Sequence, residues 1–92
     1  MEKKRINVRI AGKEYIIASY DDPKYVIRVA DLVDRRMNEL GTLIKLPAAQ
    51  LAVLTAVNAT DDMLKSRDEI NRLRNELERT RAELEALKNH AE

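Results

Sequence analysis

Residues able to carry out covalent or acid–base chemistry are sparse in this sequence of 92 residues. The chain has one histidine, His90, and no cysteine, so neither a histidine general base with a partner nor a thiolate or multi-histidine metal site is expected. Ser19 and Ser66 lack a base partner at a recognisable spacing. A small helical enzyme built on Arg, Lys and Glu is the alternative, but no pattern gathers these residues into a pocket. We therefore expect no enzyme, no metal and no cofactor.

The charged residues that do form a pattern lie in the last third of the chain. With Ile70 at heptad position a and Leu73 at d, the g positions Glu69, Glu76 and Glu83 are acidic, and the e positions are basic, namely Arg67, Arg74, Arg81 and Lys88. In a parallel, in-register pair of helices g faces the following e of the partner, whereas antiparallel pairing sets like charges together. Each exposed pair contributes only about 0.2 to 1 kcal/mol, but all the signs agree. The expected inter-helix pairs join Glu69 to Arg74, Glu76 to Arg81 and Glu83 to Lys88.

An apolar seam lies between these charges and must position them. From Ile70 to Ala91 its residues are spaced alternately three and four apart, which predicts a coiled coil, and Thr80 is the one polar member of that stretch. A lone solvated helix is the alternative, but it would leave the leucines in water. Upstream, residues 48–59 are apolar on most sides, so we expect them to contact both their own head and a second chain. The expected oligomer seam contains Leu51, Leu54, Val57, Met63, Ile70, Leu73, Leu77, Leu84 and Leu87.

The first half of the chain predicts a hairpin followed by a helix. Apolar and polar residues alternate over 6–10, a second strand is expected over 15–18, and Gly12 suits the turn between them. Asp22 and Pro23 are typical of a helix start, and Gly41 of a helix end. The apolar stripe expected along this helix contains Val26, Val29, Val33, Met37 and Leu40, and it is widened by Ile27, Ala30 and Leu32.

These elements predict an α+β chain with a small head at 1–46, which holds the hairpin and a helix over 23–40, and one long helix at 47–92 that ends in a coiled coil. A head of this size rarely folds alone without metal, disulfide or partner, so we expect an obligate homo-oligomer. No stretch resembles a signal peptide or a membrane span, and we expect a soluble, cytoplasmic protein that makes no membrane contact. The net charge is only +1, which argues against nucleic acid.

Three blocks of sequence resemble the ZapA family of bacterial cell-division proteins: Val-Arg-Ile-Ala-Gly-Lys-Glu-Tyr at 8–15, Val-Ala-Asp-Leu-Val-Asp-Arg-Arg-Met at 29–37 and Leu-Ala-Val-Leu-Thr-Ala-Val-Asn at 51–58. The resemblance covers residues 6–63, beyond which only the coiled-coil character matches. It implies a homodimer, often tetramers made by antiparallel association of two dimers. It also implies a function at the division site, which is to bind the tubulin-like GTPase FtsZ, to crosslink and bundle its protofilaments, and to stabilise the division ring.

Candidate contacts with the filament follow from the same resemblance. Charged head residues bind FtsZ in the family, and this carries over to Lys13 in the hairpin and Lys45 in the connector. Arg28 and Arg36 are added because they lie on the polar face expected for the first helix. Residues 46–49 lack the Ser or Thr cap and the acid that family members often carry there, so contacts in that region are expected to differ.

Two other classes of function stay open at this point. One is a generic coiled-coil dimerisation module with no fixed filament target. The other is a nucleic-acid-associated dimer that uses Lys3, Lys4, Arg5 and Arg9, for which the expected signature is strongly salt-dependent binding to duplex DNA.

Overall fold

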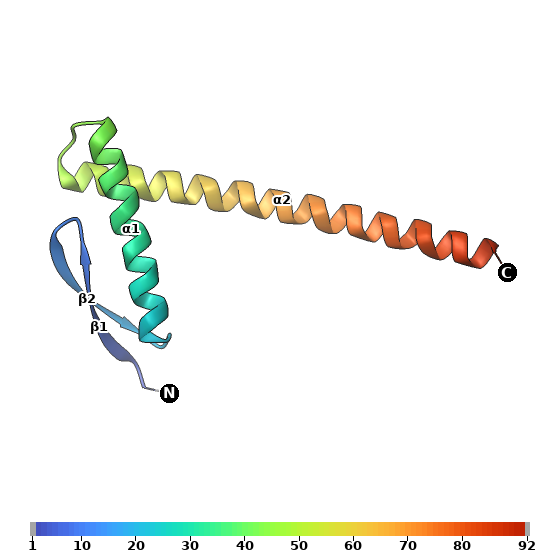
Figure 1. Cartoon of the computed structure of the whole chain (residues 1–92), viewed down its shortest axis with the longest axis horizontal. Coiled ribbons are helices and arrows are strands. Elements are labelled where there is room, and N and C mark those ends of the chain that lie inside the picture. Colours follow the sequence, from blue (N-terminus) through green and yellow to red (C-terminus); the bar gives the residue numbers. More distant parts are fainter. Residues whose placement is uncertain (1, 92) are drawn as a thin grey trace. The chain divides into compact units, whose positions relative to one another are not determined.

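A computed structural model describes residues 2–91, and its elements follow the order β1 (Lys4–Ile10), β2 (Lys13–Ser19), α1 (Pro23–Leu43) and α2 (Ala48–His90) (Figure 1). The first and last positions of the expected segments, Met1 and Glu92, lie outside the described residues. The chain forms two compact units, Met1–Val57 and Asn58–Glu92. A hairpin followed by a short and a long helix is the architecture that the sequence predicts.

The hairpin is antiparallel, with a register that runs from the Lys4 and Ser19 pair to the Ile10 and Lys13 pair. Successive side chains of a strand point to opposite faces, so one face of β1 carries the apolar residues. Ile6 and Val8 on this face are buried, and they form the core of the N-terminal unit together with two residues of α1, Val26 and Ala30. Figure 1 shows α1 lying alongside the hairpin. The helix therefore provides the apolar cover that a lone hairpin lacks.

The start of α1 is as predicted. A carboxylate oxygen of Asp22, Oδ1, accepts a hydrogen bond from the backbone N–H of Lys24 at 2.9 Å, and Pro23 occupies the first helical position. Asp22 thus satisfies one of the amide groups that have no partner within the helix.

The predicted end of this helix at Gly41 is wrong, because α1 continues to Leu43. Of the two glycines only Gly12 has a positive φ, so Gly41 does not adopt the left-handed conformation that ends many helices. The N–H of Ile44 donates to the carbonyl of Leu40 at 2.9 Å, which closes the final turn. A Cβ atom on Gly41 would lie 3.6 Å from Cδ1 of Leu51, so the glycine lies where the beginning of α2 approaches α1.

The predicted apolar stripe of α1 is wider than the buried one. Val26, Ala30 and Met37 are buried, whereas Ile27, Val29 and Leu32 are 43% to 50% exposed. An α-helix completes one turn in 3.6 residues. Ala30, four residues after Val26, therefore lies on the buried side of the helix, and Val29 does not. Val29 projects from a different side of the helix.

The long helix α2 begins one residue later than predicted. Pro47 precedes it, and the Pro47 carbonyl accepts hydrogen bonds from the N–H groups of Gln50 and Leu51, each at 3.0 Å. Pro47 is thus a capping residue and not the first residue of the helix. Within α2 only Thr55 is buried, and its hydroxyl donates to the carbonyl of Leu51 at 2.7 Å. From Ala56 to Ala91 every residue is exposed in the single chain.

Candidate functional site

The hairpin turn presents the first candidate contact residue, Lys13. The Ile10 and Lys13 pair closes the hairpin, which leaves a two-residue turn of Ala11 and Gly12. Their φ angles are +53° and +78°, and two positive values in succession are the mark of a type I′ turn. Glycine adopts such a φ without strain, but alanine does so rarely. The turn therefore has a defined shape that fixes where β2, and with it Lys13, begins.

A hydrogen bond between the turn and α1 holds the turn in place. The backbone N–H of Ala11 donates to Oδ1 of Asp34 at 2.8 Å across 23 positions of sequence, and the bond is partly buried. The other carboxylate oxygen, Oδ2, accepts from the side-chain amide of Asn38 at 3.4 Å. Asp34 therefore joins α1 to the hairpin.

A mostly apolar pocket opens beside the turn, within the N-terminal unit. Three elements form it, and Lys13 carries the only full charge among the lining side chains. The lining residues are Ile10, Ala11, Lys13, Tyr15, Ile16 and Ile17 of the hairpin, Val33 and Met37 of α1, and Ala48, Ala49 and Ala52 of α2. A concave apolar surface with one cation in its lining suits a partner segment that presents an apolar side chain beside a carboxylate.

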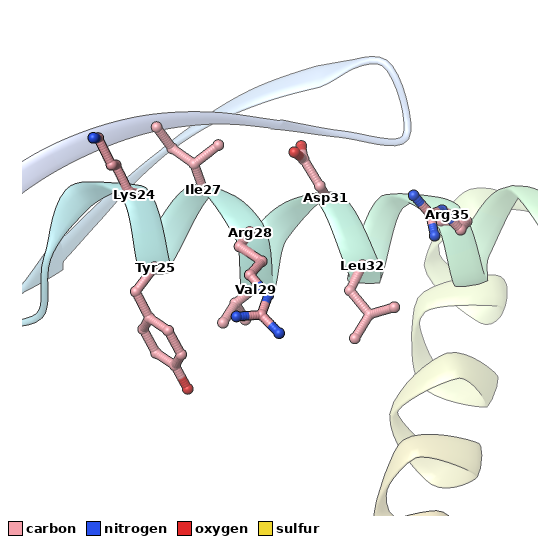
Figure 2. A pocket seen from close by; sticks show the side chains of 8 residues that line it. All are labelled: Lys24, Tyr25, Ile27, Arg28, Val29, Asp31, Leu32 and Arg35. Atoms are coloured by element: carbon pink, nitrogen blue, oxygen red, sulfur yellow. The ribbon is translucent and has the colours of Figure 1, made fainter.

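A second pocket lies along α1 and contains Arg28. Figure 2 shows Tyr25, Val29 and Leu32 projecting from one side of the helix, with Arg28 beside them and Ile27 directed away. The first three are spaced four and three residues apart, so they form a continuous apolar face on the helix. Each is about half exposed, with 54% for Tyr25, 45% for Val29 and 50% for Leu32. This face has no cover within the single chain.

The four predicted contact residues do not converge on one pocket. Lys13 lines the first pocket and Arg28 lines the second. Lys45 is exposed in the connector between α1 and α2, but it lines neither pocket. Arg36, which the sequence placed on an exposed face, is instead half buried. Lys13 is therefore the predicted residue with the best-defined surroundings.

The predicted oligomer seam divides according to exposure. Leu51 and Leu54 are half buried within their own chain. Val57, Met63, Ile70, Leu73, Leu77, Leu84 and Leu87 are all exposed, by 47% to 67%. Apolar side chains that recur at heptad spacing on one helix, and are open to water in the single chain, are what a coiled-coil seam presents before it pairs.

Two of the acidic g positions, Glu69 and Glu76, already have a partner inside the helix. Arg72, at heptad position c, donates to both carboxylate oxygens of Glu69 and, through Nη1, to Oε1 of Glu76 at 2.6 Å. The hydrogen bond from Arg72 lowers the pKa of the Glu69 carboxyl, and Glu69 raises the pKa of Arg72 in return. The predicted partners of these acids on a second chain would therefore share them with Arg72.

The remaining predicted charges, Arg74, Arg81, Glu83 and Lys88, are all exposed on α2. One further pair on this helix joins Lys65 to Asp61 at 2.9 Å, and the hydrogen bond that Lys65 donates to the Asp61 carboxylate raises the pKa of the lysine. Exposed pairs of this kind contribute little to stability.

Sites for metals or membranes were also sought among residues 2–91. No three His, Cys, Asp or Glu side chains in this range lie close enough to hold a metal ion. No single helix in the same range is both long enough and apolar enough to cross a membrane. α1 and α2 satisfy that test of length and composition only when they are taken together across a sharp bend.

Comparison with known families gives a match over nearly the whole chain. The family model described as "Cell division protein ZapA" matches residues 6–91. A "Cell division protein ZapA" of Halalkalibacterium halodurans is 46% identical over 65 residues, which cover 70% of this chain and 71% of that protein. Its counterpart from Oceanobacillus iheyensis is 43% identical over 68 residues, which cover 73% of this chain and 79% of that protein.

Two solved structures have a similar fold. A "ZapA mutant dimer from Geobacillus stearothermophilus" is 38% identical, with a TM-score of 0.67 and coverage of 85% of this chain and 92% of that one. An "Unknown conserved bacterial protein from Pseudomonas aeruginosa PAO1" is 30% identical, with a TM-score of 0.66 and coverage of 95% and 94%. The resemblance drawn from three blocks of sequence thus extends to the family model, to the relatives and to the fold.

Proposed function

This chain belongs to the ZapA family of cell division proteins, and we propose that it binds FtsZ, crosslinks and bundles FtsZ protofilaments and thereby stabilises the division ring. The observation that carries this proposal is the family match over residues 6–91. ZapA proteins are not enzymes. The function therefore rests on binding surfaces and on how many of them one assembly presents. A function of this kind is exercised in the cytoplasm, at the division site.

The proposed assembly is a homodimer. It is supported by the related structure of a ZapA mutant dimer from Geobacillus stearothermophilus and by the exposed heptad residues of α2. Two chains paired along this seam present two copies of each head, so that weak contacts with neighbouring protofilaments act together. Pairing of two such dimers into a tetramer would double the number of heads. We propose a head at 1–46 and a pairing helix at 47–92 as the functional division of the chain.

The proposed filament contact is the apolar pocket beside the hairpin turn. Lys13 is part of its lining, and the remaining lining is apolar or carries the hydroxyl of Tyr15. An acidic filament surface would meet Lys13, with Lys45, Arg28 and Arg36 as further contacts around the head. Charge attraction across such a surface weakens as salt screens it. A salt-sensitive affinity is therefore the expected signature.

Sedimentation of FtsZ polymers tests the proposal. The protein is expected to pellet with FtsZ only when GTP drives polymerisation, to thicken the polymers into bundles, and to do so less at higher salt. Lys13→Ala should weaken co-pelleting by roughly tenfold, a typical loss for one charged contact. Lys4→Ala is the matched control, because Lys4 is an exposed lysine of the same hairpin that pairs with Ser19 at the end remote from the turn.

Two results would contradict the proposal. A folded dimer that stays in the supernatant beside GTP-assembled FtsZ would remove the function. Equal losses in Lys13→Ala and Lys4→Ala would remove the pocket as the contact surface. Duplex DNA added in a parallel experiment tests the nucleic-acid alternative, for which salt-dependent binding of DNA without FtsZ binding is the expected result.

A further inference from the structure

The hairpin turn contains a backbone donor that the hairpin itself leaves unused. In a two-residue turn the closing pair, here Ile10 and Lys13, makes the last cross-strand bonds, and the N–H of the first turn residue points away from the ladder. In this chain that donor is the N–H of Ala11, and it is partly buried. A partly buried amide without a partner would destabilise the fold. Something outside the hairpin has to accept this bond.

Asp34 is the acceptor, and its geometry suits that role. Its Oδ1 lies 2.8 Å from the Ala11 nitrogen, and its Oδ2 accepts from Asn38 at 3.4 Å, so both oxygens are engaged. The residue is half buried on α1. A hydrogen bond to a carboxylate is stronger than one to a neutral acceptor. This contact therefore holds the turn more firmly than an ordinary polar contact would.

We propose that Asp34 is a positioning residue for filament binding, because it fixes the hairpin turn against α1 and thereby sets the place of Lys13 in the lining of the pocket. Val33 and Met37, neighbours of Asp34 on α1, line one wall of that pocket, and Ala11 and Lys13 line another. One hydrogen bond thus links the two walls. The proposal rests on the function proposed above, but the bond itself can be tested without FtsZ.

The first test is hydrogen exchange of the Ala11 amide in the whole protein. In the wild type this amide should be protected, and Asp34→Ala should accelerate its exchange by roughly tenfold. Asp34→Asn keeps a side-chain oxygen acceptor and should keep most of the protection. The amide of Lys24, which donates to Asp22, should exchange equally in all three proteins. A wild-type Ala11 amide that exchanges like a free one would overturn the proposal without any need for a variant.

The second test connects the turn to the filament. Asp34→Ala should weaken FtsZ co-pelleting several-fold and Asp34→Asn should largely restore it, whereas Glu39→Ala, which removes an exposed acid of the same helix that lines neither pocket, should have no effect. If Asp34 acts through Lys13, then Lys13→Ala combined with Asp34→Ala should bind no more weakly than Lys13→Ala alone.

Additive losses in the double variant would overturn the positioning role, as would failure of Asp34→Asn to restore binding. Absence of co-pelleting by the wild type would overturn the proposed function alone. In that case the exchange rates of the Ala11 amide would still decide whether Asp34 holds the turn.

Discussion

The two compact units of this chain differ in where their apolar side chains lie. In the N-terminal unit Ile6, Val8, Val26, Ala30 and Met37 are buried, with exposed fractions of 3% to 7%. In the C-terminal unit, through Ala91, no described residue is buried, although leucines recur along it at heptad spacing. The first unit thus has a hydrophobic core of its own, whereas the described residues of the second unit form no buried core within the single chain. Under the proposed pairing, stability in the second unit comes from another chain.

This difference shows that the chain uses the same apolar residue types for two purposes. In the hairpin and α1 they meet within one molecule, so their contribution does not depend on protein concentration. In the distal part of α2 they are exposed in the single chain, and under the proposed pairing they contribute upon association, because an isolated helix is marginal in water. Substitutions in the two units should therefore differ in what they change, and in whether concentration matters.

The largest effect is expected from a charge on the seam. Leu77→Asp removes an apolar contact and places a carboxylate where two helices should meet, which should weaken pairing by on the order of 3 kcal/mol per chain. Sedimentation velocity should show a smaller mass at low concentration, and circular dichroism should show less helix. The apolar residues at the beginning of α2 should remain paired, so that the ordered stalk becomes shorter.

Asn75→Asp is the control for this substitution, because it introduces the same charge at position f on the outer face of the same helix. It should leave mass and helix content unchanged. Unaltered mass and helicity in Leu77→Asp would show that the seam has been placed wrongly.

A core truncation in the first unit should have the next largest effect. Val26 is 6% exposed and packs with Ile6, Val8 and Ala30, so Val26→Ala should lower the free energy of unfolding by about 2 kcal/mol through lost contacts and a residual cavity. All the tyrosines of the chain lie in the first unit, and their fluorescence during urea unfolding reports on it. The mass at a fixed concentration should not change.

Val29→Ala is the matched comparison, because Val29 is on the same helix but is 45% exposed. A solvated valine should change stability by less than about 0.5 kcal/mol. A loss as large as that of Val26→Ala would mean that another chain covers Val29, and the contrast between the two units would then be weaker than the single chain indicates.

A smaller effect, of opposite sign, is expected at Gly41. The residue lies inside α1 and a Cβ atom would make ordinary contact with Leu51 at 3.6 Å, so Gly41→Ala should raise the free energy of unfolding by about 0.5 to 1 kcal/mol through helix propensity. Gly12→Ala provides the contrast. Its added Cβ meets nothing within 4 Å, but φ is +78°, so this substitution should cost about 1 kcal/mol. Urea unfolding compares the two, and a destabilised Gly41→Ala would contradict a helix that continues through residue 41.

The smallest effect should be a pH dependence of the long helix. The pKa of Glu69 is held below its ordinary value of 4.5 by Arg72, so the ion pair stabilises the helix at neutral pH and this contribution is lost as pH falls below 4.5 through the lowered pKa. Circular dichroism of the wild type and of Glu69→Gln should therefore differ at pH 7 and converge toward pH 2. Glu85→Gln, which removes a carboxylate outside this ion pair, should show no such convergence, and a difference that persisted at pH 2 would contradict this role of the pair.

Most of the fold could be predicted because it depends on local rules. The alternation of apolar and polar residues predicted the hairpin, and Asp22 with Pro23 predicted the start of α1. The recurring leucines predicted the long helix. The predicted end of α1 at Gly41 was wrong because glycine is common just after helices. Here Gly41 lies inside the helix, where the beginning of α2 comes close. The sequence alone does not show that approach.

The site was less predictable because its main contacts join distant parts of the chain. The bond from Ala11 to Asp34 spans 23 positions, and no periodicity indicates it. The pocket beside Lys13 likewise requires the hairpin, α1 and the first turn of α2 to meet. Glu69 and Glu76 illustrate a different limit, since heptad positions predict possible partners on another chain but do not reveal that Arg72 competes for the same acids.

The exposed length of α2 has a consequence for the amount of this protein in a cell. A helix that is covered only by another chain unfolds more often when the protein concentration is low. The unfolded segment is then a substrate for proteases. Under the proposed pairing, single chains would be degraded faster than assembled ones. The protein would therefore persist only above a threshold of synthesis, and its assemblies would form in full or be cleared.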